Sequence, residues 1–472
     1  MSEIQSNVAI PLPKNKRNMV QFGGVLLMLS STMAGLSLAT LQAPILTEMN
    51  AMKYFSLLSI FSTLGLVIMT PIGGKLGDLI GRRNIVFVSG IVCAICSVGM
   101  SVTRNFQLFM IFRLLLGAGQ GAFISTPYIL AREINEPKEV PKVMGMLSSS
   151  IAVGGFTGSI IAGILRDMGY LNLAIVFPVL PLIAGVLMIF FNLPNKKREG
   201  KVNVDILGMV ALTAALSGIL LSLNFGTNIG WSNIKIIGGL IIGIISLIAF
   251  IFIENKVQEP IIPMYLFKNK NYVSLIILGF ICYFYMSAMN VFAPLAVQKV
   301  IGSSSTVAGA LQMPRTIVTM ILPMFVGLWV SKGTQNLWKS MIIGTLFVAL
   351  PFAVLSMTSK ETSVMVYFTA LAATGIAESF RAVSITPAAQ ATLEPKDLGV
   401  GTSLINFVNT LSLLVSAAVY GIAYDIRTNG DSQDIGNITD GVNSVFRIGA
   451  VVSVIGLLLV IFVIRKQIEN KK

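Results

Sequence analysis

Four ionisable side chains lie within stretches that are otherwise almost entirely apolar: Arg113, Arg315, Glu378 and Arg381. A charge inside a membrane span is energetically costly, so such residues are functional candidates by default. Glu378 lies near the middle of its stretch and Arg381 follows three residues later, which places both on one face of a helix. The carboxyl group either binds and releases protons as access alternates between the two sides of a membrane, or forms a permanent ion pair between helices. We predict proton coupling by Glu378 and Arg381, with the structural ion pair as the alternative.

The same reasoning gives candidates for contact with a transported molecule. Arg113 shares a helix face with Gly117 and Gln120, through spacings of four and three residues. It either contacts cargo or a proton-carrying group, or ties its helix to a neighbouring carbonyl. Asn290 lies among aromatic residues that either line a cavity or pack. The predicted substrate-binding residues are Arg113, Gln120, Asn290, Arg315 and Glu378.

A short charged stretch, GGKLGDLIGRRN at residues 73–84, separates two long apolar runs. We expect its glycines to let the backbone turn tightly and helices approach closely. Asp78 can accept hydrogen bonds from a helix N-terminus or pair with an arginine, and the two arginines can reach headgroups or a facing carboxylate. A latch that opens and closes would use both signs of charge, whereas an anchor that only fixes orientation needs the arginines alone. We predict a gating motif made of Gly74, Gly77, Asp78, Gly81, Arg82 and Arg83.

The composition places these residues in a membrane protein. Of the 472 residues, 54% are hydrophobic and only 11% are charged, whereas soluble domains carry roughly 25% charged residues. The net charge of +14 lies in connections between apolar runs, a pattern that favours phospholipid headgroups over nucleic acid as the partner. No histidine is present, which removes histidine-based relays, metal sites and triads. Cys93 and Cys96 form a CxxC inside an apolar run, where packing is the expected role.

The sequence contains no P-loop, metal-ligand cluster or nucleophile–base set. We therefore expect neither an enzyme nor a cofactor, with the proton gradient as the energy source. A membrane-embedded sensor or enzyme without transport activity remains the alternative from another class. The expected partners are a small-molecule substrate, protons and the lipid bilayer.

About fourteen apolar runs are long enough to cross a bilayer, which needs about 20 residues per helix. They lie near residues 22–46, 54–73, 85–102, 106–131, 143–165, 170–191, 205–223, 235–254, 272–297, 306–330, 340–357, 363–390, 399–424 and 443–464. Lysine and arginine gather in alternate connections and in both tails, so we predict a multi-pass protein of the cell membrane with both termini and residues 74–84 in the cytoplasm.

The chain also repeats a short pattern. Thr-Pro followed by Glu-Pro-Lys-acid occurs at residues 126–139 and again at 386–397. Two related halves around a shared cavity are a recurrent transporter plan. We predict an all-α membrane protein with a six-helix half at residues 1–195, two linker helices within 196–268 and a second six-helix half at 269–472. Such a carrier is expected to work as a monomer.

The stretch GKLGDLIGRRN resembles the G-x-L-x-D-x-x-G-R-[RK] signature of the major facilitator superfamily. RLLLGAGQGA, which contains Arg113, is similar to the R-x-x-x-G-x-G motif of its fourth span. The span count and the central helix pair look like the fourteen-span drug:proton antiporter branch, and VQKVIGSSSTVAGALQMP looks like that branch's connection between spans nine and ten. The resemblance implies the fold of that family and export of small molecules in exchange for protons.

Two departures from the family patterns bear on cargo. Gly154, Gly158 and Ala162 form a small-residue stripe for close helix packing, but Ser159 replaces the proline of the antiporter motif G-x-x-x-G-P-x-x-G-G. Gly35 stands where the first span of the branch has an aspartate. Three intramembrane arginines against one glutamate then leave the predicted cavity net positive. We predict proton-coupled efflux of small amphiphilic compounds that are neutral, zwitterionic or anionic, with a dedicated exporter or an uncoupled facilitator of a metabolite or lipid-like molecule as the alternative.

Overall fold

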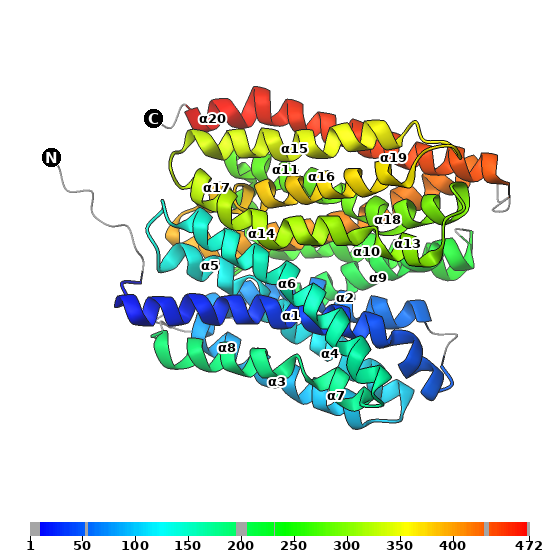
Figure 1. Cartoon of the computed structure of the whole chain (residues 1–472). Coiled ribbons are helices and arrows are strands. Elements are labelled where there is room, and N and C mark those ends of the chain that lie inside the picture. The colour runs from blue at the N-terminus through cyan, green and yellow to red at the C-terminus, as the bar shows by residue number, and fades with distance from the viewer. Residues whose placement is uncertain (1–9, 52–54, 195–204, 231, 429–433, 470–472) are drawn as a thin grey trace. The chain divides into compact units, whose positions relative to one another are not determined.

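A computed structural model describes residues 10–51, 55–194, 205–230, 232–428 and 434–469, and every regular element in these ranges is a helix (Figure 1). The apolar runs form helices because a helix satisfies its own backbone hydrogen bonds, which lipid cannot do. Polar side chains mark several of the helix starts: Asn105 accepts a hydrogen bond from the backbone N–H of Leu108, and Ser304 from that of Val307.

Thirteen helices among the described residues are long and apolar enough to cross a membrane. Helix α16 (Val364–Ala382) is not among them, because Glu378 and Arg381 lower its mean hydropathy. With α16 included, helices occupy all fourteen predicted positions. The predicted all-α membrane fold of about fourteen spans is therefore confirmed.

The contacts between helices divide the chain into two compact units. Unit 1 comprises Met1–Leu266 with Leu393–Phe407, and unit 2 comprises Phe267–Thr392 with Val408–Lys472. The linker helices thus pack with the N-terminal part of the chain, and the first ten residues of α18 belong to unit 1 although the rest of that helix belongs to unit 2. The boundaries predicted at residues 195 and 268 stay predictions.

Unit 1 contains ten α-helices among its described residues. They are α1 (Lys14–Glu48), α2 (Phe55–Ile80), α3 (Arg82–Val102), α4 (Phe106–Ile124), α5 (Thr126–Glu133), α6 (Val140–Asp167), α7 (Leu171–Val176), α8 (Val179–Asn192), α9 (Ile206–Ile229) and α10 (Ile234–Glu254), followed by the 3-10 turn η2 (Met264–Lys268), which continues into unit 2.

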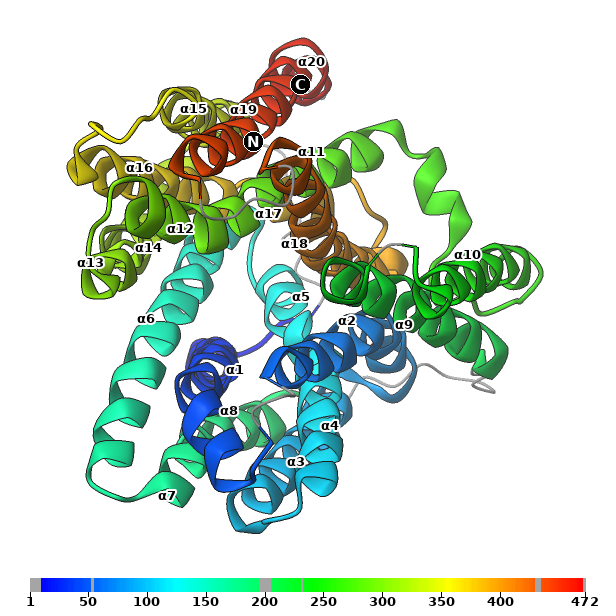
Figure 2. The same cartoon turned by 90° about the vertical axis from the view of Figure 1, so that its right-hand side faces the viewer.

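Small residues let the helices of unit 1 approach closely. Helix α6 packs along α1, and a Cβ atom at Gly158 would lie 2.5 Å from the backbone oxygen of Met33 (Figure 2). A Cβ atom at Gly154 would lie 2.3 Å from the backbone oxygen of Leu29, and Ala162 is fully buried. The predicted packing stripe of Gly154, Gly158 and Ala162 therefore faces α1.

The connection predicted at residues 73–84 is shorter than expected. Helix α2 continues to Ile80 and α3 begins at Arg82, so Gly81 alone breaks the helix, with a φ of 95°. Residues with a side chain rarely adopt such a φ, which accounts for the glycine. Gly74 and Gly77 lie inside α2 and serve close approach rather than a turn. The tight turn expected of these glycines occurs at Gly81, and the close approach expected of them occurs at Gly74 and Gly77, because α2 extends further than its apolar run.

Unit 2 contains helices interrupted by short π- and 3-10 turns. They are α11 (Lys270–Ser287), η3 (Ala288–Phe292), α12 (Ala293–Leu295), η4 (Ala296–Val300), α13 (Ser305–Ala310), α14 (Gln312–Val330), α15 (Gln335–Leu355), α16 (Val364–Ala382), α17 (Ile385–Gln390), η5 (Pro395–Asp397), α18 (Leu398–Thr428), α19 (Ile435–Leu459), η6 (Val460–Ile464) and α20 (Arg465–Glu469); η5 and the start of α18 belong to unit 1.

Aromatic side chains fill much of the core of unit 2. Phe352 packs edge-on against Phe446, and Tyr420 packs edge-on against Phe284. All four side chains are buried. Edge-to-face contacts of this kind contribute roughly 0.5–1.5 kcal/mol each beyond the area that they bury. This core holds α11, α15 and α19 together beside α16, which carries the ionisable residues.

The sequence repeat has a local structural counterpart. Helix α5 begins at the first Thr-Pro and the short α17 contains the second. After each, the lysine pairs with the preceding glutamate, Lys138 with Glu136 at 2.7 Å and Lys396 with Glu394 at 2.8 Å. The exposed Lys138–Glu136 hydrogen bond raises the pKa of Lys138 and lowers that of Glu136. The two segments therefore share conformation as well as sequence.

Candidate functional site: a clasp in unit 1 and an ion cluster in unit 2

Asp78 and Arg82 form an ion pair across the break between α2 and α3. The guanidinium of Arg82 also donates to the backbone oxygen of Gly74 at 3.2 Å and lies 4.0 Å from the Glu133 carboxylate. The Arg82 side chain is only 8% exposed and that of Asp78 24% exposed. This buried ion pair differs from an exposed one in its energetics. Removing one partner leaves the other charge both unpaired and largely shielded from solvent.

The start of α18 lies directly on this pair. The carboxylate of Asp78 accepts a hydrogen bond from the backbone N–H of Val400. A Cβ atom at Gly399 would overlap both the Asp78 carboxylate and the Arg82 guanidinium. The free N–H groups and the dipole of a helix N-terminus attract a carboxylate, so Asp78 joins α2 to α18. We call Asp78, Arg82, Gly399 and Val400 the clasp.

The remaining motif residues differ in how they relate to the clasp. A Cβ atom at Gly74 would overlap Ser403 of α18, and one at Gly77 would lie 2.6 Å from the Arg82 guanidinium. Both glycines therefore make room for the clasp. Arg83 points elsewhere, with its guanidinium carbon 4.5 Å from the centre of the Phe190 ring. Of the six predicted gating residues, the structure brings five together, whereas the Arg83 side chain packs against Phe190 of α8.

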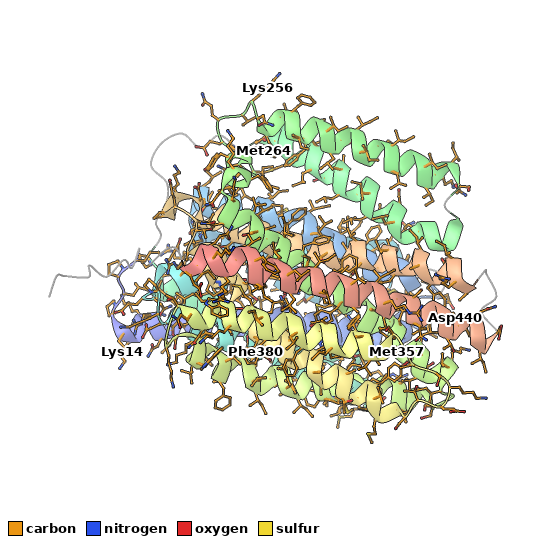
Figure 3. All side chains as sticks on the ribbon, turned by 90° about the horizontal axis from the view of Figure 1, so that it is seen from above. Lys14, Lys256, Met264, Met357, Phe380 and Asp440 are labelled. Carbon is orange, nitrogen blue, oxygen red and sulfur yellow. The ribbon has the colours of Figure 1, made fainter. Side chains whose placement is uncertain are left out.

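The segment that follows α10 is attached beside the clasp at two points. Glu259 pairs with Lys75 of α2 at 2.6 Å, and Tyr265 donates a hydrogen bond to Asp397, just before α18. Burial raises the pKa of Tyr265, and the neighbouring Asp397 raises it further, so the phenol keeps its proton and remains a donor. Figure 3 labels Lys256 and Met264 in this segment, beyond the end of α10.

In unit 2, the Glu378 carboxylate lies between two arginines. Arg315 of α14 contacts one oxygen of Glu378 at 2.6 Å, and Arg381 contacts the other at 3.5 Å. The helices can meet here because α16 carries Gly375, where a Cβ atom would lie 2.9 Å from the backbone oxygen of Arg315. Arg315 and Arg381 are both buried. Two guanidiniums against one carboxylate leave this ion cluster with a formal charge of +1.

Aromatic and amide side chains complete the ion cluster. The Arg381 guanidinium lies 3.8 Å from the centre of the Tyr283 ring, a cation–π distance, and Arg315 lies 5.8 Å from that of Tyr285. Arg315 also donates to Asn290 at 3.5 Å. Asn290 is exposed and lies in the π-turn η3, a type of distortion that often occurs at functional sites.

Arg113 and Gln120 lie on the buried face of α4 in unit 1. Gln120 donates to the backbone oxygen of Ser31 on α1 at 3.4 Å. Arg113 is 5% exposed, and its Nε and Nη1 have no acceptor among the described residues. Beside Gln120 is a cavity of about 10 Å³, which is close to the size of one water molecule.

The structure thus gathers four predicted residues, Arg315, Glu378, Arg381 and Asn290, in unit 2. Glu378 and Arg381 lie on one helix face, as their spacing predicts, and their side chains are in contact; their roles in transport stay predictions. Our sequence reasoning missed Gly399, which no local pattern links to Asp78. It also missed the attachments of Lys75 and Asp397, whose partners are far away in the sequence.

The second half has no equivalent clasp within the described residues. Its corresponding loop carries Ser331 in place of the acid, and that hydroxyl donates to the backbone oxygen of Leu328 in its own helix.

A family model matches most of the chain, and curated relatives cover most of its length. The family model of the Major Facilitator Superfamily matches residues 22–417. The multidrug transporter protein MdtP of Bacillus subtilis (strain 168) is 28% identical over 419 residues, which cover 88% of this chain and 76% of that protein. Multidrug resistance protein 3 of the same organism is 26% identical over 424 residues, which cover 87% of this chain and 79% of that protein.

Solved structures are similar to this chain in fold. The human organic anion transporter MFSD10 superimposes with a TM-score of 0.65 at 15% identity, covering 95% of this chain and 100% of that one. The proton:xylose symporter XylE gives a TM-score of 0.64 at 13% identity, covering 95% of each chain. Identities this low show a shared fold alone.

Proposed function

The chain belongs to the major facilitator superfamily of transporters, and on this premise we propose that it exports small amphiphilic compounds at the expense of the proton gradient. The relatives named multidrug transporters support this proposal. The observation that carries it furthest is the buried ion cluster of Arg315, Glu378 and Arg381, since charges held inside a helical bundle are typical of ion and substrate pathways.

The clasp supplies a gate for alternating access. Helix α18 begins in unit 1 at the clasp and continues in unit 2. Breaking the contacts of Asp78 with Arg82 and Val400 would release the start of α18 from α2. Each such charge-assisted hydrogen bond contributes about 1.5–3 kcal/mol, a range that a conformational change can readily offset. We infer that the clasp closes one mouth of the transport pathway and opens once in each cycle.

Glu378 is the proposed proton-binding group. Its two oxygens face Arg315 and Arg381 separately, so a proton can replace one arginine while the other contact persists. A cargo molecule that draws Arg315 away would couple its own binding to proton uptake at Glu378. The formal charge of +1 favours cargo that is anionic, zwitterionic or neutral over a quaternary cation.

Transport by the purified protein in proteoliposomes tests this function. With an imposed pH gradient, we expect movement of an amphiphilic carboxylate or sulfonate dye and little movement of ethidium. E378Q should transport without dependence on the gradient, whereas E361Q, which changes an exposed loop carboxylate, should behave like the wild type. Strong ethidium transport with no response to anions would refute the cargo class, and gradient-dependent transport by E378Q would remove Glu378 from coupling.

An uncoupled facilitator, or a dedicated exporter of one anionic or lipid-like metabolite, is the second candidate. The contacts of Glu378 with two arginines favour it, because a carboxylate satisfied on both oxygens can serve as a permanent structural tie. In this case wild-type transport would follow the cargo gradient alone, and collapsing the pH gradient with an uncoupler would leave the rate unchanged.

A further inference from the structure

Two buried carboxyl groups lie where linker helix α9 begins and linker helix α10 ends. Asp205 caps α9, and its Oδ1 accepts from the backbone N–H of Gly208 at 2.8 Å. Glu254 is the last residue of α10, and its Oε2 accepts from the backbone N–H of Ile262 at 3.0 Å. Each carboxyl thus uses one oxygen to hold the backbone of a neighbouring segment.

The other two oxygens face one another. Asp205 Oδ2 and Glu254 Oε1 are buried and have no partner among the described residues. A Cβ atom at Gly208 would overlap Asp205 Oδ2 and lie 2.9 Å from Glu254 Oε1, so both oxygens lie close to the same position beside Gly208. Asp205 is 7% exposed and Glu254 3% exposed. Two ionised carboxylates that converge in such a place repel each other and lack water to compensate.

No described cation faces this pair. Helix α2 packs against α9, but its Lys75 is bound to Glu259 and its Asp78 to Arg82. In the segment after α10, Lys256 is exposed, and Lys235 lies at the opposite end of that helix. The described residues also contain no group of three side chains that could hold a metal ion. Residues 195–204, which include Lys196, Lys197, Arg198, Glu199 and Lys201, lie outside the described residues.

We propose that Asp205 and Glu254 bind one proton between them, and that this shared proton holds residues 255–266 against the ends of α9 and α10. A proton on either carboxyl turns the contact between two acceptors into a short, charge-assisted hydrogen bond. Its loss leaves two facing anions, which separate and pull Glu254 away from the backbone N–H of Ile262.

The proton-binding pair reaches the clasp through the segment that it holds. Glu259 and Tyr265 lie in this segment and bind Lys75 of α2 and Asp397 before α18. Lys75 lies in α2 and Asp397 directly precedes α18, and these are the two helices that the clasp joins. Release of residues 255–266 at alkaline pH therefore removes two supports beside the clasp. The linker helices become a pH-dependent restraint on gating, separate from Glu378.

Two isosteric variants test the pair without relying on transport. In D205N, an amide N–H donates to Glu254 in place of the shared proton, and asparagine still caps α9. In E254Q, the new amide donates to Asp205 while its oxygen still accepts from Ile262. We would measure hydrogen exchange of residues 255–266 in the full-length protein between pH 6 and pH 9, corrected for intrinsic exchange, together with infrared pH-difference spectra.

In the wild type, protection of residues 255–266 should fall at high pH by at least about tenfold, as expected for loss of one charge-assisted hydrogen bond. A protonated-carboxyl band should vanish over the same range. Both variants should keep their protection at high pH and lack that band. The proposal is overturned if protection in the wild type does not change with pH, if both variants lose it as the wild type does, or if no band is assignable to the pair because a lysine of residues 195–204 neutralises it.

Discussion

Gly399 lies so close to Asp78 that any side chain at position 399 would overlap the Asp78 carboxylate. The two residues belong to α18 and α2, helices whose sequences share no local pattern. Because glycine has no Cβ, the backbone N–H of Val400 can reach the carboxylate directly. The clasp therefore requires glycine at position 399 as well as the charged pair. A substitution at Gly399 is the first test of the clasp.

Replacing Gly399 with alanine should push the start of α18 away from Asp78 and Arg82. We expect transport in proteoliposomes to fall by at least about tenfold, the effect of about 1.4 kcal/mol. G333A is the control, because this glycine lies in the second-half loop that corresponds to residues 73–84, and a Cβ atom there would meet nothing within 4 Å. Equal transport by G399A and G333A would show that the clasp does not act as a gate.

The adjacent arginines of the motif should differ in importance. Arg82 contacts Asp78, Glu133 and the backbone of Gly74, whereas Arg83 packs on Phe190. R82A should abolish most transport and lower the melting temperature, because it leaves the partly buried Asp78 without its partner. R83A removes the same formal charge and should retain most transport. If both variants lose transport equally, the arginines act as an orientation anchor instead.

The contact of Arg315 with Glu378 should be strongly coupled in a double-mutant cycle of unfolding free energy. Removing either partner alone leaves a buried charge and should cost about 3–5 kcal/mol. Removing both should cost less than the sum of the single changes. Arg465 and Glu469 form an exposed pair on α20 and provide the control, with an expected coupling of about 0.3–0.5 kcal/mol. A coupling for the Arg315–Glu378 pair no larger than this control would contradict the ion cluster.

The glycine stripe of α6 should tolerate no added methyl group. A Cβ atom at Gly158 would lie 2.5 Å from the Met33 backbone oxygen, so G158A should destabilise the protein by about 1–3 kcal/mol through overpacking. At Gly163 a Cβ atom would meet nothing within 4 Å, so G163A should be neutral or stabilising by up to about 1 kcal/mol. Thermal unfolding in detergent measures both. Equal destabilisation by the two changes would argue against tight packing of α6 on α1.

Much of the helical framework follows from the sequence, although helix ends do not. Long apolar runs predict the spans because a lipid-exposed backbone must satisfy its own hydrogen bonds. Glycine marks the break at position 81, but the continuation of α2 through Lys75 and Asp78 to Ile80 could not be read from hydropathy. Charged residues end an apolar run without ending a helix, since the helix needs only its own backbone bonds.

The sequence by itself determined the membrane class, the family motifs and the local pair of Glu378 with Arg381, because composition, motif spacing and helical periodicity are local properties. Only the tertiary structure decided that Arg315 reaches Glu378 from 63 residues away and that Lys75 reaches Glu259 from 184 residues away. It also brought Gly399 onto Asp78 and Asp205 against Glu254. Such contacts depend on which helix faces pack together, and that choice is made by the fit of side chains across the whole bundle.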